Sequence, residues 1–306
     1  MTEMPAKSYR GPLPALTTNE AEIKTNLQKH VSTLAGEIGP RNTIQFKALE
    51  RASQYVEDSL KALGYTVSSQ EYAVDGRNVR NLIAEIRGGA RASEIVVIGA
   101  HYDTVMDSPG ADDNSSGVAG LLEIARIMKT SHSARTLRFV AFVNEEPPYF
   151  QTAKMGSRQY AKQARKDREN IVAVVSIETI GMYSDAKESQ HYPSGFSALY
   201  PSEGNFIGFV GNTSSRPLVR EMVRTFRETT AFPSEGIAAP SWIAGIGWSD
   251  QWSFWQEGYQ GVMVTDTAPF RNPNYHLQSD KPDTLDYERM ARVVQGLAKV
   301  VSRLVG

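Results

Sequence analysis

The segment 95–103 constrains the fold of this chain more than any other part of its sequence. It reads Ile-Val-Val-Ile-Gly-Ala-His-Tyr-Asp, a run of apolar and small residues that ends on His101 and Asp103. An apolar run without alternation is typical of a strand buried on both faces, in the middle of a parallel sheet. A loop rich in Gly and Asp follows at 110–117, and a helix is predicted after it. Ligands of open α/β sheets bind beyond the carboxyl ends of the strands, and imidazole and carboxylate groups there indicate a metal such as zinc.

Two further buried strands deliver acidic side chains in the same way. The segment 136–143 is followed by the pair Glu145-Glu146, and the segment 171–177 is followed by Glu178. Because parallel strands end at one edge of a sheet, we expect these carboxylates to gather near the first site. The remaining predicted elements are strands at 65–74, 79–86, 205–210 and 261–265, and helices at 19–34, 46–63, 116–128, 156–166, 217–229 and 286–304.

One large α/β domain is the expected organisation of the 306 residues. Residues 1–16 are predicted to form an extended arm, and residues 17–306 a single domain. The segment 182–247 is rich in Ser, Gly, Pro and Tyr. We interpret it as an elaborated insertion over the site, because it has too few apolar residues for a core of its own.

The composition restricts the partners and the chemistry. The formal net charge is −1 and no block of Lys and Arg stands out, so neither nucleic acid nor an anionic membrane is an expected partner. Residues 1–9 lack an apolar run, so we expect no signal peptide and no membrane span. Localisation stays open between the cytoplasm and export with a leader that precedes this sequence. The chain has no cysteine, so any metal must be held by His, Asp and Glu.

The adjacent acids Glu145 and Glu146 can divide a catalytic task. Two neighbouring glutamates usually mark a solvated face, but here they end a buried strand, where unpaired carboxylates cost several kcal/mol. Neighbours on a strand point to opposite sides, so one can bind a metal while the other stays free as a base. Metal-assisted hydrolysis needs that division, because a cation acidifies water and a carboxylate takes its proton.

Four motifs occur in a fixed order along the chain. They are Gly-Ala-His-Tyr-Asp at 99–103, Gly-Ala-Asp-Asp-Asn-Ser-Ser-Gly-Val-Ala at 110–119, Asn-Glu-Glu at 144–146 with Gly-Ser at 156–157, and Tyr-His at 275–276. Together they resemble metallopeptidase family 28, the two-zinc aminopeptidases of clan MH, which are related to glutamate carboxypeptidase and glutaminyl cyclase. The resemblance covers about residue 81 to the C-terminus. It implies a three-layer α/β/α sandwich with a mixed, mostly parallel central sheet, and a peptide substrate.

The resemblance also implies the ligands of two Zn²⁺ ions. His101 and Glu178 match the ligands of one zinc, and Glu146 and His276 match those of the other. Asp113 matches the carboxylate that bridges both.

Three further residues match catalytic positions of the family. Glu145 matches the general base, and Asp103 matches the acid that orients the histidine ligand. Tyr275 matches a tyrosine that hydrogen-bonds the developing oxyanion.

The chain departs from the family pattern at several points. Most aminopeptidases of the family have Asp where this chain has Glu178, although the longer arm still reaches a metal. The connection 147–155 is longer than usual. Gln251 stands where relatives often have His, so no role is assigned to it. We expect Asp250 to cap the helix that follows it and not to act in catalysis.

The expected reaction is zinc-dependent hydrolysis of the N-terminal peptide bond, and three alternatives stay open. A carboxypeptidase needs a cation for the substrate carboxylate, and Arg271 is the candidate. A glutaminyl cyclase uses one zinc and does not need Asp113 as a bridge. A metal-free binding domain of the same fold predicts broken ligands, whereas all five are acceptable here.

An aromatic cluster lies between 242 and 255. Core packing is the expected role for at least half of its members, and an apolar pocket for the N-terminal side chain of the substrate is the functional alternative. The residues are Trp242, Trp248, Trp252, Phe254 and Trp255.

Overall fold

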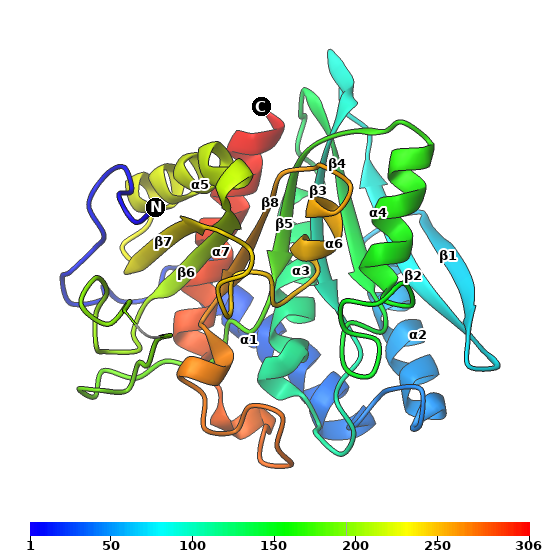
Figure 1. Ribbon diagram of the computed structural model, residues 1–306, viewed down its shortest axis with the longest axis horizontal. Helices are drawn as coiled ribbons and strands as arrows, with labels where there is room; N and C mark the ends of the chain where they lie inside the picture. The colour runs from blue at the N-terminus through cyan, green and yellow to red at the C-terminus, as the bar shows by residue number, and fades with distance from the viewer. Residues whose placement is uncertain (194) are drawn as a thin grey trace.

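A mixed sheet forms the middle of the molecule in the computed structural model, which describes residues 1–193 and 195–306. Its strands are β1 Val67–Val74, β2 Arg77–Ile86, β3 Arg91–His101, β4 Arg135–Phe142, β5 Asn170–Ile177, β6 Ile207–Asn212, β7 Ser234–Ala239 and β8 Gly261–Thr265. The strand order is β1-β2-β4-β3-β5-β8-β6-β7 (Figure 1). Strands β4, β3, β5 and β8 are parallel to one another, and β6 is parallel to β7. The pairs β1–β2, β2–β4 and β6–β8 are antiparallel.

Helices cover both faces of this sheet (Figure 1). They are α1 Thr18–Val31, α2 Phe46–Ala62, α3 Gly117–Met128, α4 Gly156–Lys166, α5 Arg216–Thr229, α6 Gln251–Trp255 and α7 Tyr287–Val305, with short π-helical turns η1 Ser32–Ile38 and η2 Ala111–Ser116 and 3₁₀ turns η3 Thr213–Ser215, η4 Ala268–Phe270 and η5 Pro282–Thr284. Helices α4 and α6 pack together on one face, while α1, α3 and α5 each contact α7 on the opposite face. The predicted three-layer sandwich is confirmed.

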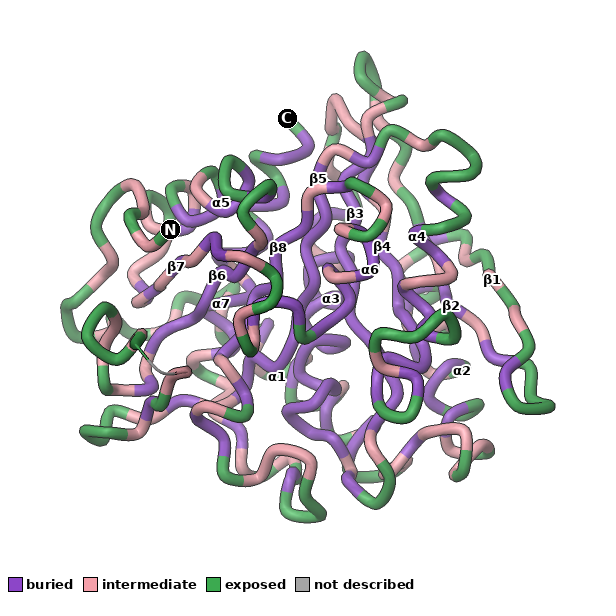
Figure 2. Tube along the Cα trace, in the orientation of Figure 1, coloured by how far each residue is buried: buried purple, intermediate pink, exposed green. Residues whose placement is uncertain are grey.

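The central strand β3 is buried on both sides, as its apolar run predicts (Figure 2). Val96 and Ile98 belong to the larger core under the α1, α3 and α7 layer. Val97 belongs to the smaller core, which includes Phe142 of β4 and Phe254 of α6. Because side chains alternate along a strand, both layers attach to the same strand and hold its carboxyl end in place.

The first helix begins where its sequence provides a cap. The side chain of Thr17 accepts a hydrogen bond from the backbone N–H of Glu20, whose carboxylate accepts one from the N–H of Thr17 in return. This reciprocal pair is a capping box. The residues before it contain no helix or strand. They run along β7, where the N–H of Ala238 donates to the carbonyl of Met1 and the N–H of Ser234 donates to Oγ of Ser8.

Strand β7 was not predicted from the sequence. Its residues are Ser-Glu-Gly-Ile-Ala-Ala, a segment with little of the β-branched and aromatic content that favours strands. Parallel pairing with β6 holds it at the edge of the sheet. The segment 182–247 therefore contributes β6 and β7 to the central sheet, in addition to its loops.

The parallel strands β3, β4, β5 and β8 all end at one edge of the sheet. The loops that follow them carry the predicted site residues. Among the described residues, no helix is long and apolar enough to cross a membrane.

Candidate metal centre

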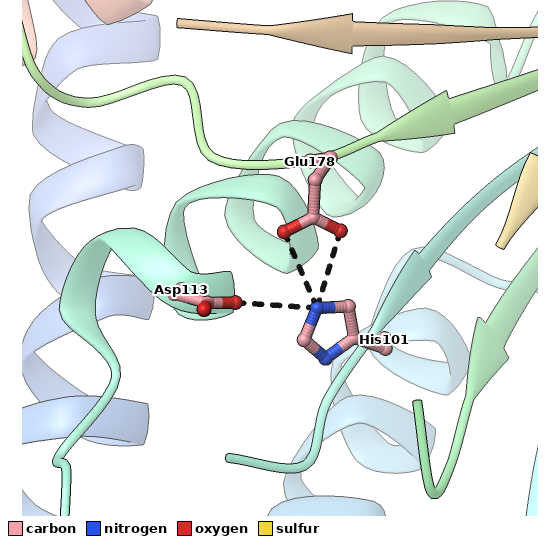
Figure 3. Close-up of side chains that lie close together, drawn as sticks. All are labelled: His101, Asp113 and Glu178. Carbon is pink, nitrogen blue, oxygen red and sulfur yellow. Dashed lines mark hydrogen bonds and ion pairs between the residues drawn. The ribbon is translucent and has the colours of Figure 1, made fainter. Parts of the chain in front are cut away.

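His101, Asp113 and Glu178 form a first cluster of metal-ligand type (Figure 3). His101 ends β3, Glu178 follows β5, and Asp113 lies in η2. Nε2 of His101 lies 3.3 Å from Oδ1 of Asp113 and 3.2 Å from Oε2 of Glu178. All three residues are buried, and each turns its polar end toward the same point.

Asp113 also belongs to a second cluster, with Glu146 and His276. Nε2 of His276 lies 3.0 Å from Oδ2 of Asp113 and 3.3 Å from Oε2 of Glu146. Oδ1 of Asp113 therefore faces one histidine and Oδ2 faces the other. The structure brings together all five residues that the sequence suggests as ligands, in two groups that share one carboxylate.

The donor set fits two divalent cations. Buried polar atoms cost several kcal/mol when they are left without a partner, yet three atoms of the two clusters have no hydrogen bond within the described residues: Oδ1 of Asp113, Oε1 of Glu146 and Nε2 of His276. A cation in each cluster would satisfy these atoms. Imidazole nitrogen and carboxylate oxygen in groups of three are the ligands of catalytic zinc sites, which leave one position open.

The carboxylates in and beside the two clusters raise the pKa values of the two histidines. Burial acts to lower the pKa of His276, but Asp113 and Glu146 outweigh it and raise the pKa to about 10. Burial also acts to lower the pKa of His101, but Glu178 and Glu145 outweigh it and raise this pKa well above its ordinary value. Zinc binds neutral imidazole, so protonation of these histidines competes with metal binding, and metal affinity is expected to rise with pH.

Glu145 lies beside the clusters but belongs to neither of them. Its Oε2 is 3.8 Å from Nε2 of His101, and burial raises the pKa of Glu145 well above its ordinary value. The carboxylate of Asp103 accepts the backbone N–H groups of Glu145 at 3.1 Å and Glu146 at 3.2 Å. Oδ1 of Asp103 also lies 3.6 Å from Nδ1 of His101. Asp103 therefore links the carboxyl end of β3 to that of β4, next to the metal clusters.

Asp250 does not have the role expected from the sequence. It precedes α6, but its side chain makes no capping hydrogen bond, and both carboxylate oxygens are buried without a partner in the described part of the chain. Burial raises the pKa of Asp250 to about 7. The capping prediction is wrong because the residue has helical φ and ψ angles, whereas a capping side chain needs an extended backbone at that position. Gln251 belongs to neither metal cluster, and its Nε2 donates to the carbonyl of Ile246 and to the sulfur of Met263.

A hollow of about 850 Å³, open solvent at its mouth included, lies next to the first metal cluster. Glu178, a member of that cluster, lines the hollow, and so does Tyr275, whose ring stacks on that of His276 in the second cluster. Its floor is the face of the sheet at β8, β6 and β7, and its walls are mostly apolar. Of the aromatic cluster predicted near residue 250, Trp248 lines the hollow, Phe254 is in the core, and Trp242 is exposed.

Arg41 is a functional candidate that the sequence reading missed. Its side chain is fully buried and contacts the loop 109–116 that carries Asp113, the metal loop, without contacting a carboxylate of the described residues. A single arginine after Gly-Pro carries no pattern that predicts burial. Its six acceptors are the carbonyls of Leu34, Gly39, Tyr102, Pro109 and Gly110 and Oγ of Ser115.

Arg271 is occupied elsewhere. Its guanidinium donates to Oε1 of Gln190 and to the carbonyls of Met182 and Phe206. It is buried beneath the ring of Phe206. These contacts fasten the loop after β5 to the loop after β8 and leave Nη2 buried without a partner among the described residues. Arg271 does not line the hollow beside the clusters, where a clamp for a substrate carboxylate would have to lie.

Comparison with known proteins places the chain in a family. Residues 81–301 match the sequence profile of peptidase family M28, and this range includes every residue of the two metal clusters. The chain belongs to peptidase family M28. Membership confirms the resemblance predicted from the motifs, and with it the expectation of a hydrolase that acts on peptide bonds.

Individual relatives of this M28 peptidase agree with that assignment. It is 35% identical over 280 residues to the uncharacterized protein YfbL of Escherichia coli, covering 89% of this chain and 85% of YfbL. It is 35% identical over 97 residues to aminopeptidase YwaD of Bacillus subtilis, covering 32% of this chain and 20% of that protein. Among solved structures, a zinc aminopeptidase from Bacillus subtilis has the same fold, with a TM-score of 0.72, 17% identity, and coverage of 95% of this chain and 96% of that one.

Proposed function

We propose that this M28 peptidase is a zinc-dependent aminopeptidase that hydrolyses the N-terminal peptide bond of peptides with two metal ions. The observation that carries the proposal is the shared position of Asp113, whose two oxygens face His101 and His276 separately. A carboxylate placed in this way is the feature that a two-metal hydrolase needs and a one-metal enzyme does not.

Each metal position has three residues to hold it. His101, Glu178 and Asp113 would hold one ion, and Asp113, Glu146 and His276 the other. Bound divalent cations lower the pKa of water toward neutrality and polarise a carbonyl group.

Glu145 is the group best placed to move protons. It lies outside both ligand sets, so its carboxylate is free to take a proton from the attacking water and return it to the leaving amine. Asp103 fixes the backbone of Glu145 and the ring of His101. Tyr275 stands between the clusters and the hollow, with its ring stacked on that of His276. Its hydroxyl would donate a hydrogen bond to the substrate oxygen as negative charge develops there.

The charges around the site favour an aminopeptidase over a carboxypeptidase. Besides the proposed ligands, the acidic residues Asp103, Glu145 and Asp250 lie close to the clusters, and acidic groups attract an α-ammonium group and repel an α-carboxylate. The two buried arginines nearby, Arg41 and Arg271, donate to protein carbonyls and side-chain oxygens. The aminopeptidase name of YwaD points in the same direction.

We also propose that residues 17–306 act as one peptidase domain, with residues 1–16 as an arm along its edge. In support, the arm contributes backbone and side-chain contacts to β7, and α1 packs against α7 at the other end of the chain.

Metal content and substrate class test the proposal together. Metal-replete protein should contain about two zinc ions per chain, and a chelator should abolish activity that Zn²⁺ or Co²⁺ restores. The protein should cleave aminoacyl-arylamides and unblocked peptides, and leave N-acetylated peptides with a free C-terminus intact. One zinc per chain with cyclisation of N-terminal glutamine would establish a cyclase instead, and cleavage from the C-terminus would establish a carboxypeptidase.

A further inference from the structure

Asp280 makes an unusual set of contacts with the loop that carries Asp113. Three consecutive N–H groups donate to it: Ala111 to its carbonyl at 3.2 Å, Asp112 to Oδ1 at 2.9 Å, and Asp113 to Oδ2 at 3.1 Å. Asp280 is fully buried, and each carboxylate oxygen accepts one of these bonds. Asp280 is neither a proposed metal ligand nor a proposed proton-transfer group.

These N–H groups belong to η2, the turn that precedes α3, where Asp113 and Asn114 have non-helical φ and ψ angles. Buried backbone N–H groups that are not paired within a helix or sheet need an acceptor from elsewhere in the chain. Here the acceptor is Asp280, which is distant in the sequence.

Asp280 also belongs to the loop that carries His276. Its N–H donates to the carbonyl of Leu277 at 3.1 Å, which keeps this loop tightly turned. A second bond joins the same two loops, from Nδ2 of Asn272 to Oδ2 of Asp112 at 2.7 Å. The histidine and the bridging carboxylate of the second cluster thus lie on two loops that Asp280 fastens together.

Arg41 also contacts the metal loop, but as a hydrogen-bond donor, whereas Asp280 is an acceptor. It donates to the carbonyls of Pro109 and Gly110 and to Oγ of Ser115. Asp280 satisfies the donors of the loop while Arg41 satisfies its acceptors. A loop held in this way keeps its shape before a metal arrives.

We infer that Asp280 is a positioning residue that sets the separation between Asp113 and His276, and thereby the affinity of the second metal position. The inference rests on the two metal positions of the proposed function. Hydrogen bonds to an ionised carboxylate are roughly twice as strong as neutral ones, so the negative charge of Asp280 matters as well as its shape. Both of its oxygens bond backbone N–H groups, so it acts through the loop.

Zn²⁺ titration of metal-free protein tests this inference with variants that keep a single site. His101→Ala preserves the three ligands of the second cluster, and His276→Ala preserves those of the first. Asp280→Asn should weaken Zn²⁺ binding by about 10-fold or more in the His101→Ala background, the loss typical for a partner that orients a ligand. In the His276→Ala background the loss should be clearly smaller. Asp283→Asn, which removes an exposed charge from the same region, is the matched control and should change neither affinity.

Other outcomes would contradict either this inference or the proposed function. Equal losses in both backgrounds, or no loss in either, would overturn the inference. A wild-type protein that binds only one zinc would contradict the proposed function, while the effect of Asp280→Asn on that zinc could still be read. If Asp280→Asn does not fold, Asn272→Ala removes the other bond between the two loops and should weaken the second position by a few-fold, and an unchanged affinity would count against the inference.

Discussion

The Oγ atom of Ser249 donates a 2.5 Å hydrogen bond to Oε2 of Glu178. The same oxygen lies 3.4 Å from Nδ2 of Asn114. These contacts orient a side chain that is one methylene longer than the aspartate usual in the family. They leave the carboxylate facing His101, which explains how a longer arm still joins the first cluster.

Removing the carboxylate of Glu178 should release metal. Glu178→Ala takes one of three donors from the first cluster, so we expect zinc affinity to fall by about 10-fold or more. Glu178→Asp should be much milder, because it keeps the donor type. Competition with a zinc indicator measures both variants against Glu188→Ala, which alters an exposed glutamate. Unchanged zinc content and activity in Glu178→Ala would remove this residue from the ligand set.

Glu145 and Glu146 should respond differently to the same substitution. Glu145→Gln keeps the shape of the side chain and removes its ability to accept a proton, so the variant should retain both metals and bind substrate. Its kcat should fall by about 10²- to 10⁴-fold, the range of general acid–base catalysis. Glu146→Gln should lose metal from the position shared with His276, and excess zinc should relieve part of its defect.

Metal analysis and single-turnover kinetics distinguish these two outcomes. Loss of zinc in Glu145→Gln, with normal zinc in Glu146→Gln, would mean that the roles are exchanged. Full activity in both variants would rule out the mechanism proposed for this pair.

The hollow beside Glu178 should determine which N-terminal residue is preferred. Gly208 on β6 forms part of its floor, and a Cβ atom there would lie 3.1 Å from the carbonyl of Thr265. Gly208→Val should therefore shrink the hollow and lower kcat/KM for substrates with N-terminal Leu or Phe by about 10-fold relative to Ala, as expected for a methylene-scale change in an apolar pocket. Gly89→Val is the control, because Gly89 is exposed and a Cβ atom there would make only an ordinary contact, at 3.7 Å from the carbonyl of Ser133. An equal loss for all three substrates would show that the hollow is not the side-chain pocket.

His30 should make the metal-free protein sensitive to mild acid. Burial, with a smaller contribution from Lys29, lowers the pKa of His30 from 6.5 to about 4, and Nδ1 lies 2.8 Å from the Tyr55 hydroxyl. The unfolded chain therefore binds a proton at higher pH than the folded chain does. The contribution of His30 to stability is present above pH 6.5, is lost as the pH falls from 6.5 to 4, and levels off below that.

Urea unfolding at several pH values checks this prediction. The shift corresponds to at most about 3 kcal/mol between pH 7 and pH 4. His30→Gln should flatten the dependence in that window, and His132→Gln, at an exposed position, should not. Chelator must be present throughout, because acid also releases metal. An unchanged slope in His30→Gln would assign the acid sensitivity to other groups.

Most of the elements that carry the site could be predicted from the sequence. The apolar runs that became β3, β4, β5 and β8 have the length and composition of doubly buried strands, so local pattern and tertiary environment agree. Polar residues at their carboxyl ends had to meet, because parallel strands end at one edge of the sheet. The grouping of His101 with Glu178 and of Glu146 with His276 came from the family resemblance, and the distances agree with it.

Only the tertiary structure decided the contacts that hold this site together. Strand β7 depends on its pairing with β6, because its own residues have weak strand propensity. Arg41, Asp250 and Asp280 are charged residues in ordinary loop sequences, and their burial follows from loops that converge from distant parts of the chain. A sequence pattern records the periodicity of a single element. It carries no information about which carbonyl or N–H group a distant side chain will meet, and those partners fix the shape of the metal loop.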